Sequence, residues 1–286
     1  MATVRDQQKE MVRRRLSGRH CEAGDLHALQ DKAEDAIASY RRATELDGRS
    51  ARAYVGMGDA YALVDRDDRA RAAYEKALSA DPHSAEAHFC MADLLARSGQ
   101  VQEAIDEMEI AVECDPDRAY YLYRLSELYT RVGDDILAEE GLMCAIDIDP
   151  GEGLYRYKLG ELHARDREWD LAARAYIAAT QCAPLDDFYH MRLVTALLRL
   201  NRRPSALAVL RRTCRISPDN RAYRYLLGEL LVLMGDLEAG SAELRRAGRL
   251  DSYDQDYVRR IKIRSGQLEE GEKLVLIGPV ETPTLK

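Results

Sequence analysis

A proline recurs every 34 residues through most of this chain, and no other feature limits its folding as strongly. The recurring prolines are Pro82, Pro116, Pro150, Pro184 and Pro218. Equal spacing without insertions indicates that one structural unit is repeated and that each unit packs on its neighbours in the same way. Counting outward from these prolines gives seven units. They span residues 17–50, 51–84, 85–118, 119–152, 153–186, 187–220 and 221–254.

Each unit is predicted to be a pair of helices. Apolar residues at positions 7, 8 and 11 of the unit mark one helical face, and residues at positions 20, 24 and 27 mark a second. Positions 20 and 27 are each alanine in six of the seven units. Small side chains let the two helices approach closely, while the larger residue at position 24 fills the remaining space. A glycine often lies between the two faces, as in residues 97–100, and the proline ends the second helix.

The second unit shows this pattern most completely. It carries Tyr54, Met57, Gly58, Tyr61, Ala70, Tyr74, Ala77 and Pro82. The pattern resembles the tetratricopeptide repeat (TPR) family, and the resemblance covers residues 17–254. It implies an all-α fold, a right-handed superhelical solenoid of helix–turn–helix repeats whose first helices line a concave groove. The pentatricopeptide RNA-binding family has a similar layout but a period one residue longer, which this chain does not keep.

Three further segments flank the repeats. Residues 1–16 are basic and are expected to form a short helix, either as an N-terminal cap or free. Residues 255–275 are expected to form C-terminal capping helices, because residues 264–268 match the turn between the helices of the third unit. That turn arrives three residues early, so the first capping helix is expected to be one turn short. Residues 276–286 are expected to be extended or disordered.

The composition argues against several functional classes. The formal net charge is −8, and an acidic chain is poorly suited to bind nucleic-acid phosphates. No apolar stretch is long enough to span a membrane, and the first residues lack the apolar core of a secretory signal, so a cytoplasmic location is expected.

The six cysteines are scattered without a paired motif, which favours reduced thiols. Because no phosphate-loop, metalloprotease or serine-hydrolase motif is present, and the histidines lack metal-ligand spacing, we expect no enzyme, no cofactor and no metal.

The resemblance assigns positions 2, 5, 6, 9, 12 and 13 of each first helix to the concave groove. Aromatic and apolar residues gather at these positions from the third unit to the seventh, and basic residues lie beside them. Tyrosine and methionine are residue types enriched at binding interfaces. The candidate partner-binding residues are Tyr120, Tyr123, Arg124, Arg131, Tyr157, Lys158, Arg165, Phe188, Met191, Arg192, Arg199 and Tyr225.

Two interpretations of these candidates stay open. The aromatic side chains either face the groove or pack against the neighbouring first helix. The basic side chains either contact a ligand or pair with an acidic residue four positions earlier, as in Glu127 and Arg131. Position 9 is not acidic in the sixth unit, so Arg192 and Arg199 are expected to be the freest to bind a carboxylate.

The sequence predicts a non-catalytic scaffold or adaptor that binds a protein or peptide partner, with acidic groups on the partner facing the basic residues. The alternative is a structural subunit or assembly factor of a larger complex, which docks through its convex acidic face or its termini. One TPR subtype holds chaperone C-termini with a lysine at position 5 and an asparagine at position 9. This chain has neither, so no such partner is expected. Self-association is left open.

Overall fold

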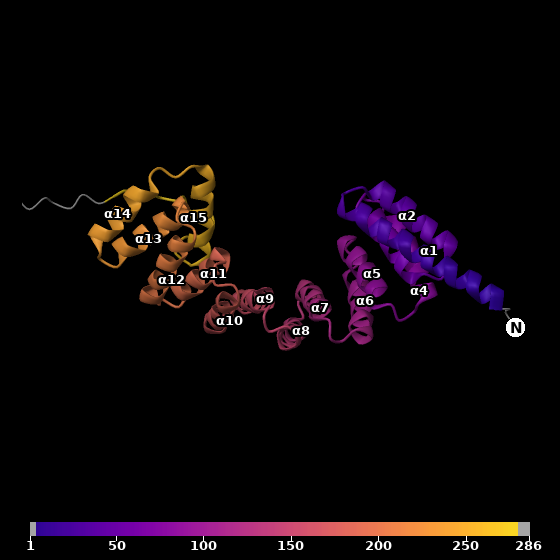
Figure 1. Ribbon diagram of the computed structural model, residues 1–286. Coiled ribbons are helices and arrows are strands. Elements are labelled where there is room, and N and C mark those ends of the chain that lie inside the picture. The colour runs from indigo at the N-terminus through magenta and orange to yellow at the C-terminus, as the bar shows by residue number, and fades with distance from the viewer. Residues whose placement is uncertain (1–3, 280–286) are drawn as a thin grey trace, which may run out of the picture. The chain divides into compact units, whose positions relative to one another are not determined.

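The computed structural model describes residues 4–279, and every regular element in this range is an α-helix. The helices follow one another along the chain as contacting pairs joined by short turns (Figure 1). They form two compact units, Met1–Ile148 and Asp149–Lys286. The chain therefore has the all-α repeat fold that the 34-residue period predicts.

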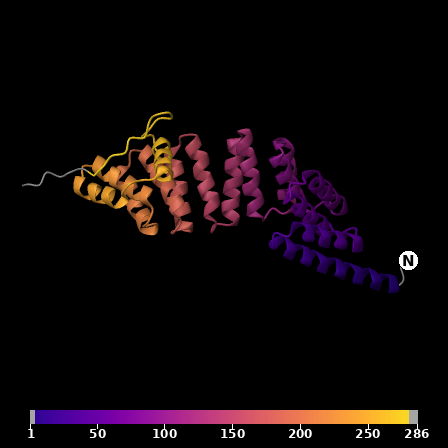
Figure 2. The same ribbon diagram turned by 90° about the horizontal axis from the view of Figure 1, so that it is seen from above.

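The first unit contains one helix pair for each of the first four repeats, and Figure 2 shows the members of a pair lying side by side. Its helices are α1 (Val4–Leu29), α2 (Ala33–Leu46), α3 (Ala51–Ala62), α4 (Asp67–Ala80), α5 (Ala85–Arg97), α6 (Val101–Cys114), α7 (Ala119–Val132) and α8 (Asp135–Ile148). The N-terminal segment does not form a helix of its own but continues α1. Side chains of residues 6–16 are all exposed, and burial begins at Ser17, whose hydroxyl donates to the carbonyl oxygen of Ala43 at 2.9 Å.

The second unit contains the last three helix pairs and one further helix. Its helices are α9 (Gly153–Arg165), α10 (Trp169–Cys182), α11 (Asp187–Arg199), α12 (Arg203–Ile216), α13 (Arg221–Leu233), α14 (Leu237–Ala247) and α15 (Ser252–Arg264). None of the helices between residues 4 and 279 combines the length and the hydropathy that crossing a bilayer requires.

The two helices of each repeat meet at the small residues of positions 20 and 27. The alanines at these positions are fully buried in both units. They include Ala36, Ala43, Ala70, Ala77, Ala104, Ala111, Ala138, Ala145, Ala172, Ala179 and Ala206. Protein interiors are packed nearly as densely as crystals, so a larger side chain here would have to push the two helices apart.

A tyrosine at position 24 fixes three of these helix pairs. In the second repeat, the ring of Tyr74 lies so close to Gly58 that a Cβ atom there would overlap it, and the Tyr74 hydroxyl donates to Asp59 at 2.7 Å. The same arrangement joins Tyr40 to Gly24 and Asp25 in the first repeat, and Tyr176 to Gly160 and Glu161 in the fifth. Glycine at position 8 therefore makes room for a tyrosine at position 24, and the acidic residue at position 9 accepts its hydroxyl.

The seventh repeat departs from the 34-residue register. Its second helix, α14, has 11 residues, whereas the second helix α12 of the previous repeat has 14, because α14 ends at Gly248 with a positive φ. The next helix, α15, consequently begins at Ser252 and has 13 residues, as α13 does. The expectation of a shortened capping helix after residue 254 is therefore wrong. A single full-length helix forms the cap, and residues 265–279 contain no helix.

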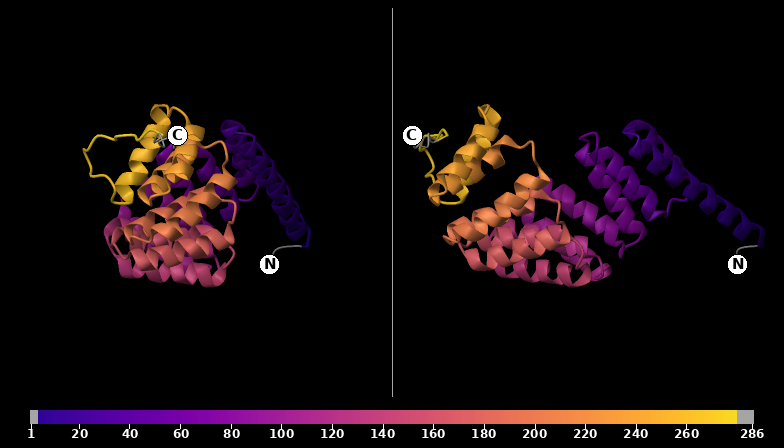
Figure 3. Two further views of the ribbon diagram at one scale, coloured as in Figure 1. Left: turned by 90° about the vertical axis from the view of Figure 1, so that its left-hand side faces the viewer. Right: turned by 60° about the vertical axis from the view of Figure 1, so that its left-hand side comes forward.

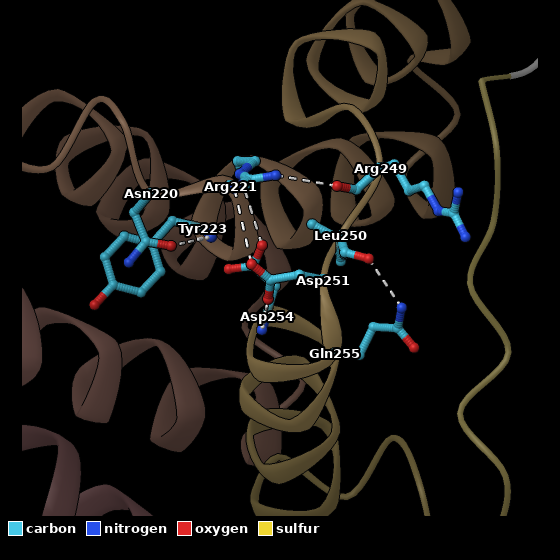
Figure 4. A network of polar contacts seen from close by, with 8 residues as sticks. All are labelled: Asn220, Arg221, Tyr223, Arg249, Leu250, Asp251, Asp254 and Gln255. Carbon is cyan, nitrogen blue, oxygen red and sulfur yellow. Dashed lines mark hydrogen bonds and ion pairs between the residues drawn. The ribbon is translucent and has the colours of Figure 1, made fainter.

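A polar network fixes the start of α15 against α13 (Figure 4). The Asp251 carboxylate accepts the backbone N–H of Asp254 at 2.9 Å and so caps the helix. Arg221, at the start of α13, lies 3.8 Å from the Asp251 carboxylate and 3.7 Å from that of Asp254, and it donates to the carbonyl oxygen of Arg249 at 3.2 Å. These contacts hold α15 to α13 at its N-terminal end.

All six cysteines are free thiols in the structure. Cys144 on α8 is exposed, whereas Cys21 and Cys214 are buried. Burial raises the pKa of Cys214 to about 11 and also raises the pKa of Cys21. The thiolate is the reactive form of cysteine, so these buried thiols are expected to be inert near neutral pH.

We expect Cys144 to react with a maleimide well before Cys214 when the native chain is labelled at about pH 8, because Cys144 is accessible and Cys214 forms little thiolate there. Mass spectrometry of a labelling time course measures both rates. Labelling of Cys214 should accelerate as the pH approaches its raised pKa or when the chain is unfolded. Equal rates at the two sites in the native chain would contradict the burial of Cys214.

Replacing Ala70 with leucine tests the packing of the helix pairs. Ala70→Leu overfills the contact between α3 and α4, and we expect a loss of about 1–3 kcal/mol in the free energy of unfolding. Urea denaturation followed by circular dichroism measures it. Ala72→Leu adds the same side chain on the exposed face of α4 and should change stability by less than about 0.5 kcal/mol. A similar effect of the two substitutions would refute the proposed packing constraint.

Candidate partner-binding site

In the first unit, aromatic rings cross from α5 to α7. Phe89 stacks on Tyr121 with ring centroids 5.0 Å apart and lies 5.7 Å from the ring of Tyr120. Tyr120 lies in turn 5.8 Å from Tyr123. Tyr120 remains exposed, whereas Tyr123 is buried and donates its hydroxyl to Glu127 at 2.7 Å. Tyr120 is therefore accessible to a partner, and Tyr123 packs within the repeats.

Basic residues on α7 join it to the first helix of the preceding repeat. Arg124 forms an ion pair with Asp93 of α5 and lies 3.6 Å from Glu127. Arg131 donates to the carbonyl oxygen of Ala96, near the C-terminal end of α5, at 3.1 Å. Pairing between helices therefore supplements the pairing within one helix that the sequence pattern suggests.

In the second unit, Tyr157 on α9 and Phe188 on α11 make the corresponding contact. Their ring centroids lie 5.1 Å apart in an edge-to-face arrangement, and Tyr157 also stacks on Tyr189 at 5.5 Å. Phe188 is exposed, and the guanidinium carbon of Arg192 lies 4.8 Å from its ring centroid. Phe188 is therefore an exposed aromatic ring beside an arginine, and Tyr120 in the first unit is exposed one helical turn before Arg124.

A pocket of about 360 Å³ lies next to this aromatic contact, between α9, α10, α11 and α15. Four arginines line it, and we call it the arginine pocket. They are Arg165 on α9, Arg192 and Arg199 on α11, and Arg264 on α15. The remaining wall is largely apolar or aromatic. It consists of Glu161, Ala164, Trp169, Tyr176, Thr195, Ala196 and Ile263.

Glu161 is the only carboxylate among the residues that line the arginine pocket. It accepts the hydroxyl of Tyr176 at 2.5 Å and lies 3.5 Å from Arg192 and 3.8 Å from Arg264. Burial raises the pKa of Tyr176, so its hydroxyl stays protonated and continues to donate. The buried Nε of Arg192 has no hydrogen-bond partner. Four arginines and a single carboxylate thus line this pocket, and Arg192 and Arg264 are the two that approach the carboxylate.

Arg192 and Arg199, which are expected to be the freest to bind a carboxylate, both have partners in the structure. Arg192 pairs with Glu161 of the preceding repeat, and Arg199 binds the C-terminal end of α15. The Arg199 Nε donates to the carbonyl oxygen of Arg264 at 2.5 Å, and its Nη2 donates to that of Ile263 at 3.0 Å. The last carbonyl groups of a helix lack partners within it and carry partial negative charge, so a guanidinium there stabilises the helix end.

The capping helix covers part of the face that the sequence assigns to a partner. Met191 and Tyr225 are buried in one apolar cluster with Val258 and Ile261 of α15, so of the two interpretations left open these two side chains follow the packing one. Lys262 of α15 also reaches α13. Its Nζ lies 2.8 Å from the Glu229 carboxylate, and both side chains are almost fully buried.

The remaining candidates lie on α9. Lys158 is partly exposed, and Arg165 is exposed with its Nε 4.0 Å from the Asp166 carboxylate. Arg264 and Trp169 line the arginine pocket but are not among the candidates from the sequence. The Arg199 guanidinium lies 5.2 Å from the Trp169 ring centroid. Residues 4–279 contain no cluster of three histidine, cysteine or carboxylate side chains that is placed to hold a metal ion.

Comparison with known proteins places this repeat geometry in a family. One tetratricopeptide repeat profile matches residues 68–128, and a second profile of the same family matches residues 21–85 and 191–254. Together these matches cover more than half of the chain. The chain belongs to the tetratricopeptide repeat family. TPR proteins generally mediate protein–protein interactions. No curated protein matches the sequence significantly.

Several solved TPR structures resemble this TPR chain. The pilF protein of Pseudomonas aeruginosa is 18% identical with a TM-score of 0.62, over 72% of this chain and 94% of its own. YrrB, described as a TPR protein with an unusual peptide-binding site, is 22% identical with a TM-score of 0.53, over 68% and 97%. A TPR protein of Parabacteroides merdae is 14% identical with a TM-score of 0.57, over 88% and 99%. At these identities the likeness extends to the fold alone.

Removing Lys262 tests how firmly α15 is held on α13. We expect Lys262→Met to lower the free energy of unfolding by about 3–5 kcal/mol, because Glu229 is then left charged and buried without its partner. The double variant Lys262→Met/Glu229→Gln should recover most of this loss, since no unpaired charge remains. Denaturant unfolding of the wild type, both single variants and the double variant measures the coupling. Purely additive losses would show that the pair does not hold α15.

Proposed function

We propose that this protein is a non-catalytic interaction scaffold that binds an acidic segment of a protein partner along the first helices of its repeats, the face that the sequence assigns to a concave groove. The arginine pocket carries this proposal. An acidic side chain of the partner enters the pocket, and the neighbouring exposed ring of Phe188 anchors the adjacent part of the segment.

The charge of the arginine pocket favours an anionic ligand. Four arginines line the pocket, and Glu161 is its single lining carboxylate. A guanidinium binds a carboxylate through charge-assisted and often bidentate hydrogen bonds, which are stronger than neutral ones. The partly apolar wall, which includes Trp169, lowers the local dielectric and strengthens such a contact.

The size of the pocket favours a side chain over a large ligand. Its volume of about 360 Å³ lies at the lower end of the range for ligand sites. Exposed aromatic residues with nearby arginines are the residue types that carry most of the binding energy at interfaces. Phe188 provides such an anchor in the second unit, and Tyr120, one helical turn before Arg124, provides an exposed ring in the first. A peptide-binding site described for YrrB, which shares the fold, is consistent with this use of TPR helices.

Arg165→Glu is the sharpest test, because Arg165 is exposed at the arginine pocket, whereas Arg199 also binds the end of α15. We expect peptides selected on the wild-type chain from a displayed library to contain Asp or Glu. The substitution should weaken the best of them about tenfold or more, with a stronger effect at low salt. Fluorescence anisotropy measures the dissociation constants.

Arg174→Glu is the matched control, since it makes the same charge change on the exposed part of α10 and does not line the pocket. It should leave the affinity within about twofold of the wild type. Selected peptides without acidic residues, or equal losses in the two variants, would refute the arginine pocket as the site.

The alternative role as a subunit or assembly factor has its own support in the first unit. The first turns of α1 leave Met11 and Val12 exposed, and α8 exposes Ile136 and Met143. Exposed apolar side chains of this kind are typical of docking surfaces. A partner held there would bind the Arg165→Glu variant as tightly as the wild type and would be lost on Met11→Glu or Ile136→Glu.

A further inference from the structure

Residues 274–277 of the second unit pack against the unit itself. After α15, the chain turns at Gly266 and again at Gly271, both with positive φ, and continues without helical structure (Figure 3). Leu274, Leu276 and Ile277 then pack against the apolar cluster that includes Tyr225 and Val258. We call residues 274–277 the C-terminal strap.

The strap has the side-chain pattern of an extended segment bound on one side. Leu274 and Leu276 are partly buried, whereas the intervening Val275 is 72% exposed. Successive side chains of an extended chain point in opposite directions, so this alternation places Leu274 and Leu276 on the repeats and Val275 toward solvent. Ile277 departs from the alternation, because it is also partly buried and its backbone N–H is bound to the repeats.

A hydrogen-bonded relay fastens the strap to α13. The backbone N–H of Ile277 donates to the Tyr225 hydroxyl at 2.9 Å, and this hydroxyl donates to Glu229 at 3.3 Å. Glu229 in turn pairs with Lys262 of α15 at 2.8 Å. Burial raises the pKa of Tyr225, so the hydroxyl stays protonated and can both accept and donate. Tyr225 therefore recognises a backbone amide, a group that every residue except proline offers.

Recognition of one backbone amide together with alternate apolar side chains is how proteins bind extended peptides. The contacts on this face do not require the bound segment to be covalently connected to α15. Within the described residues, the strap makes this single hydrogen bond to α13, so little holds it closed. Segments with few buried contacts open locally at low free-energy cost.

We propose that the face of α13 around Tyr225 is a binding site for an extended apolar segment of the pattern Leu-x-Leu-Ile, and that the strap occupies it intramolecularly until a partner segment of the same pattern displaces it. Because the strap is attached to the protein, its effective concentration at the site is high. A competing segment binds only while the strap is released, so its apparent affinity is its intrinsic affinity multiplied by the fraction of time that the site is open. This site lies on α13 and differs from the arginine pocket, so it does not depend on the proposed function.

A labelled peptide with the sequence of residues 271–279 is the probe, and the full chain with Leu274→Asp and Leu276→Asp is the released variant. We expect the peptide to bind the released variant about tenfold or more tighter than the wild type, because the attached strap no longer competes. Adding Tyr225→Phe should weaken this binding several-fold by removing the acceptor of the amide. Fluorescence anisotropy measures the affinities, and thermal unfolding confirms that each variant is folded.

Two controls make the result decisive. Val275→Asp places the same charge on the exposed edge of the strap and should behave as the wild type, and a peptide with aspartate at both leucine positions should not bind the released variant. Absence of peptide binding to a folded, released variant would overturn the site on α13. Equal peptide affinity for the wild type and the released variant would overturn intramolecular occupation. A concentration-dependent dimer that requires Leu276 would assign the strap to a second copy and would also overturn it.

Discussion

The close approach of two helices at small residues is the constraint on which the rest of this structure depends. Alanines at positions 20 and 27 are fully buried in repeat after repeat, so the helices of each pair lie in nearly the same relation every time. Where position 24 is tyrosine, glycine at position 8 brings the ring so close to the first helix that its hydroxyl reaches the acidic residue at position 9. Internal packing thereby fixes the orientation of a charged residue on the surface of the first helix.

That fixed carboxylate determines the charge pattern between neighbouring repeats. Glu161 is held by Tyr176 from its own repeat and is approached by Arg192 from the next repeat and by Arg264 from the cap. Asp93 is likewise paired with Arg124 of the following repeat. At the arginine pocket one carboxylate balances two arginines, because α15 contributes Arg264 to the pocket lining and no acidic residue. The arginine pocket is therefore a consequence of placing α15 beside a regular repeat.

Sequence features within one repeat predicted the helix pairs. Contacts between residues far apart in the sequence explain why the surroundings of Met191 and Arg199 were not predicted. The proline period, the alanine columns and the groove positions all lie within one 34-residue unit, so the helix pairs could be predicted from the sequence. Met191 shares an apolar cluster with Ile261, and Arg199 binds the carbonyl oxygen of Arg264, and both of these partners lie more than sixty residues later in the chain. Their position depends in turn on Gly248, which ends α14 early and shifts the register of α15. No repeat column contains that information.

The capping helix links the two surfaces of the second unit on which ligands are proposed to bind. Arg264 lines the arginine pocket, while Lys262, one half-turn away on the same helix, holds the Glu229–Tyr225 relay that fastens the strap. A ligand that alters the position of α15 at one surface must alter it at the other, because Arg199 and Arg221 tie the two ends of the helix to α11 and α13. Linkage requires any such effect to be reciprocal. If a segment that displaces the strap changes the affinity of the arginine pocket for an acidic ligand, that ligand changes the affinity of the protein for the segment by the same factor.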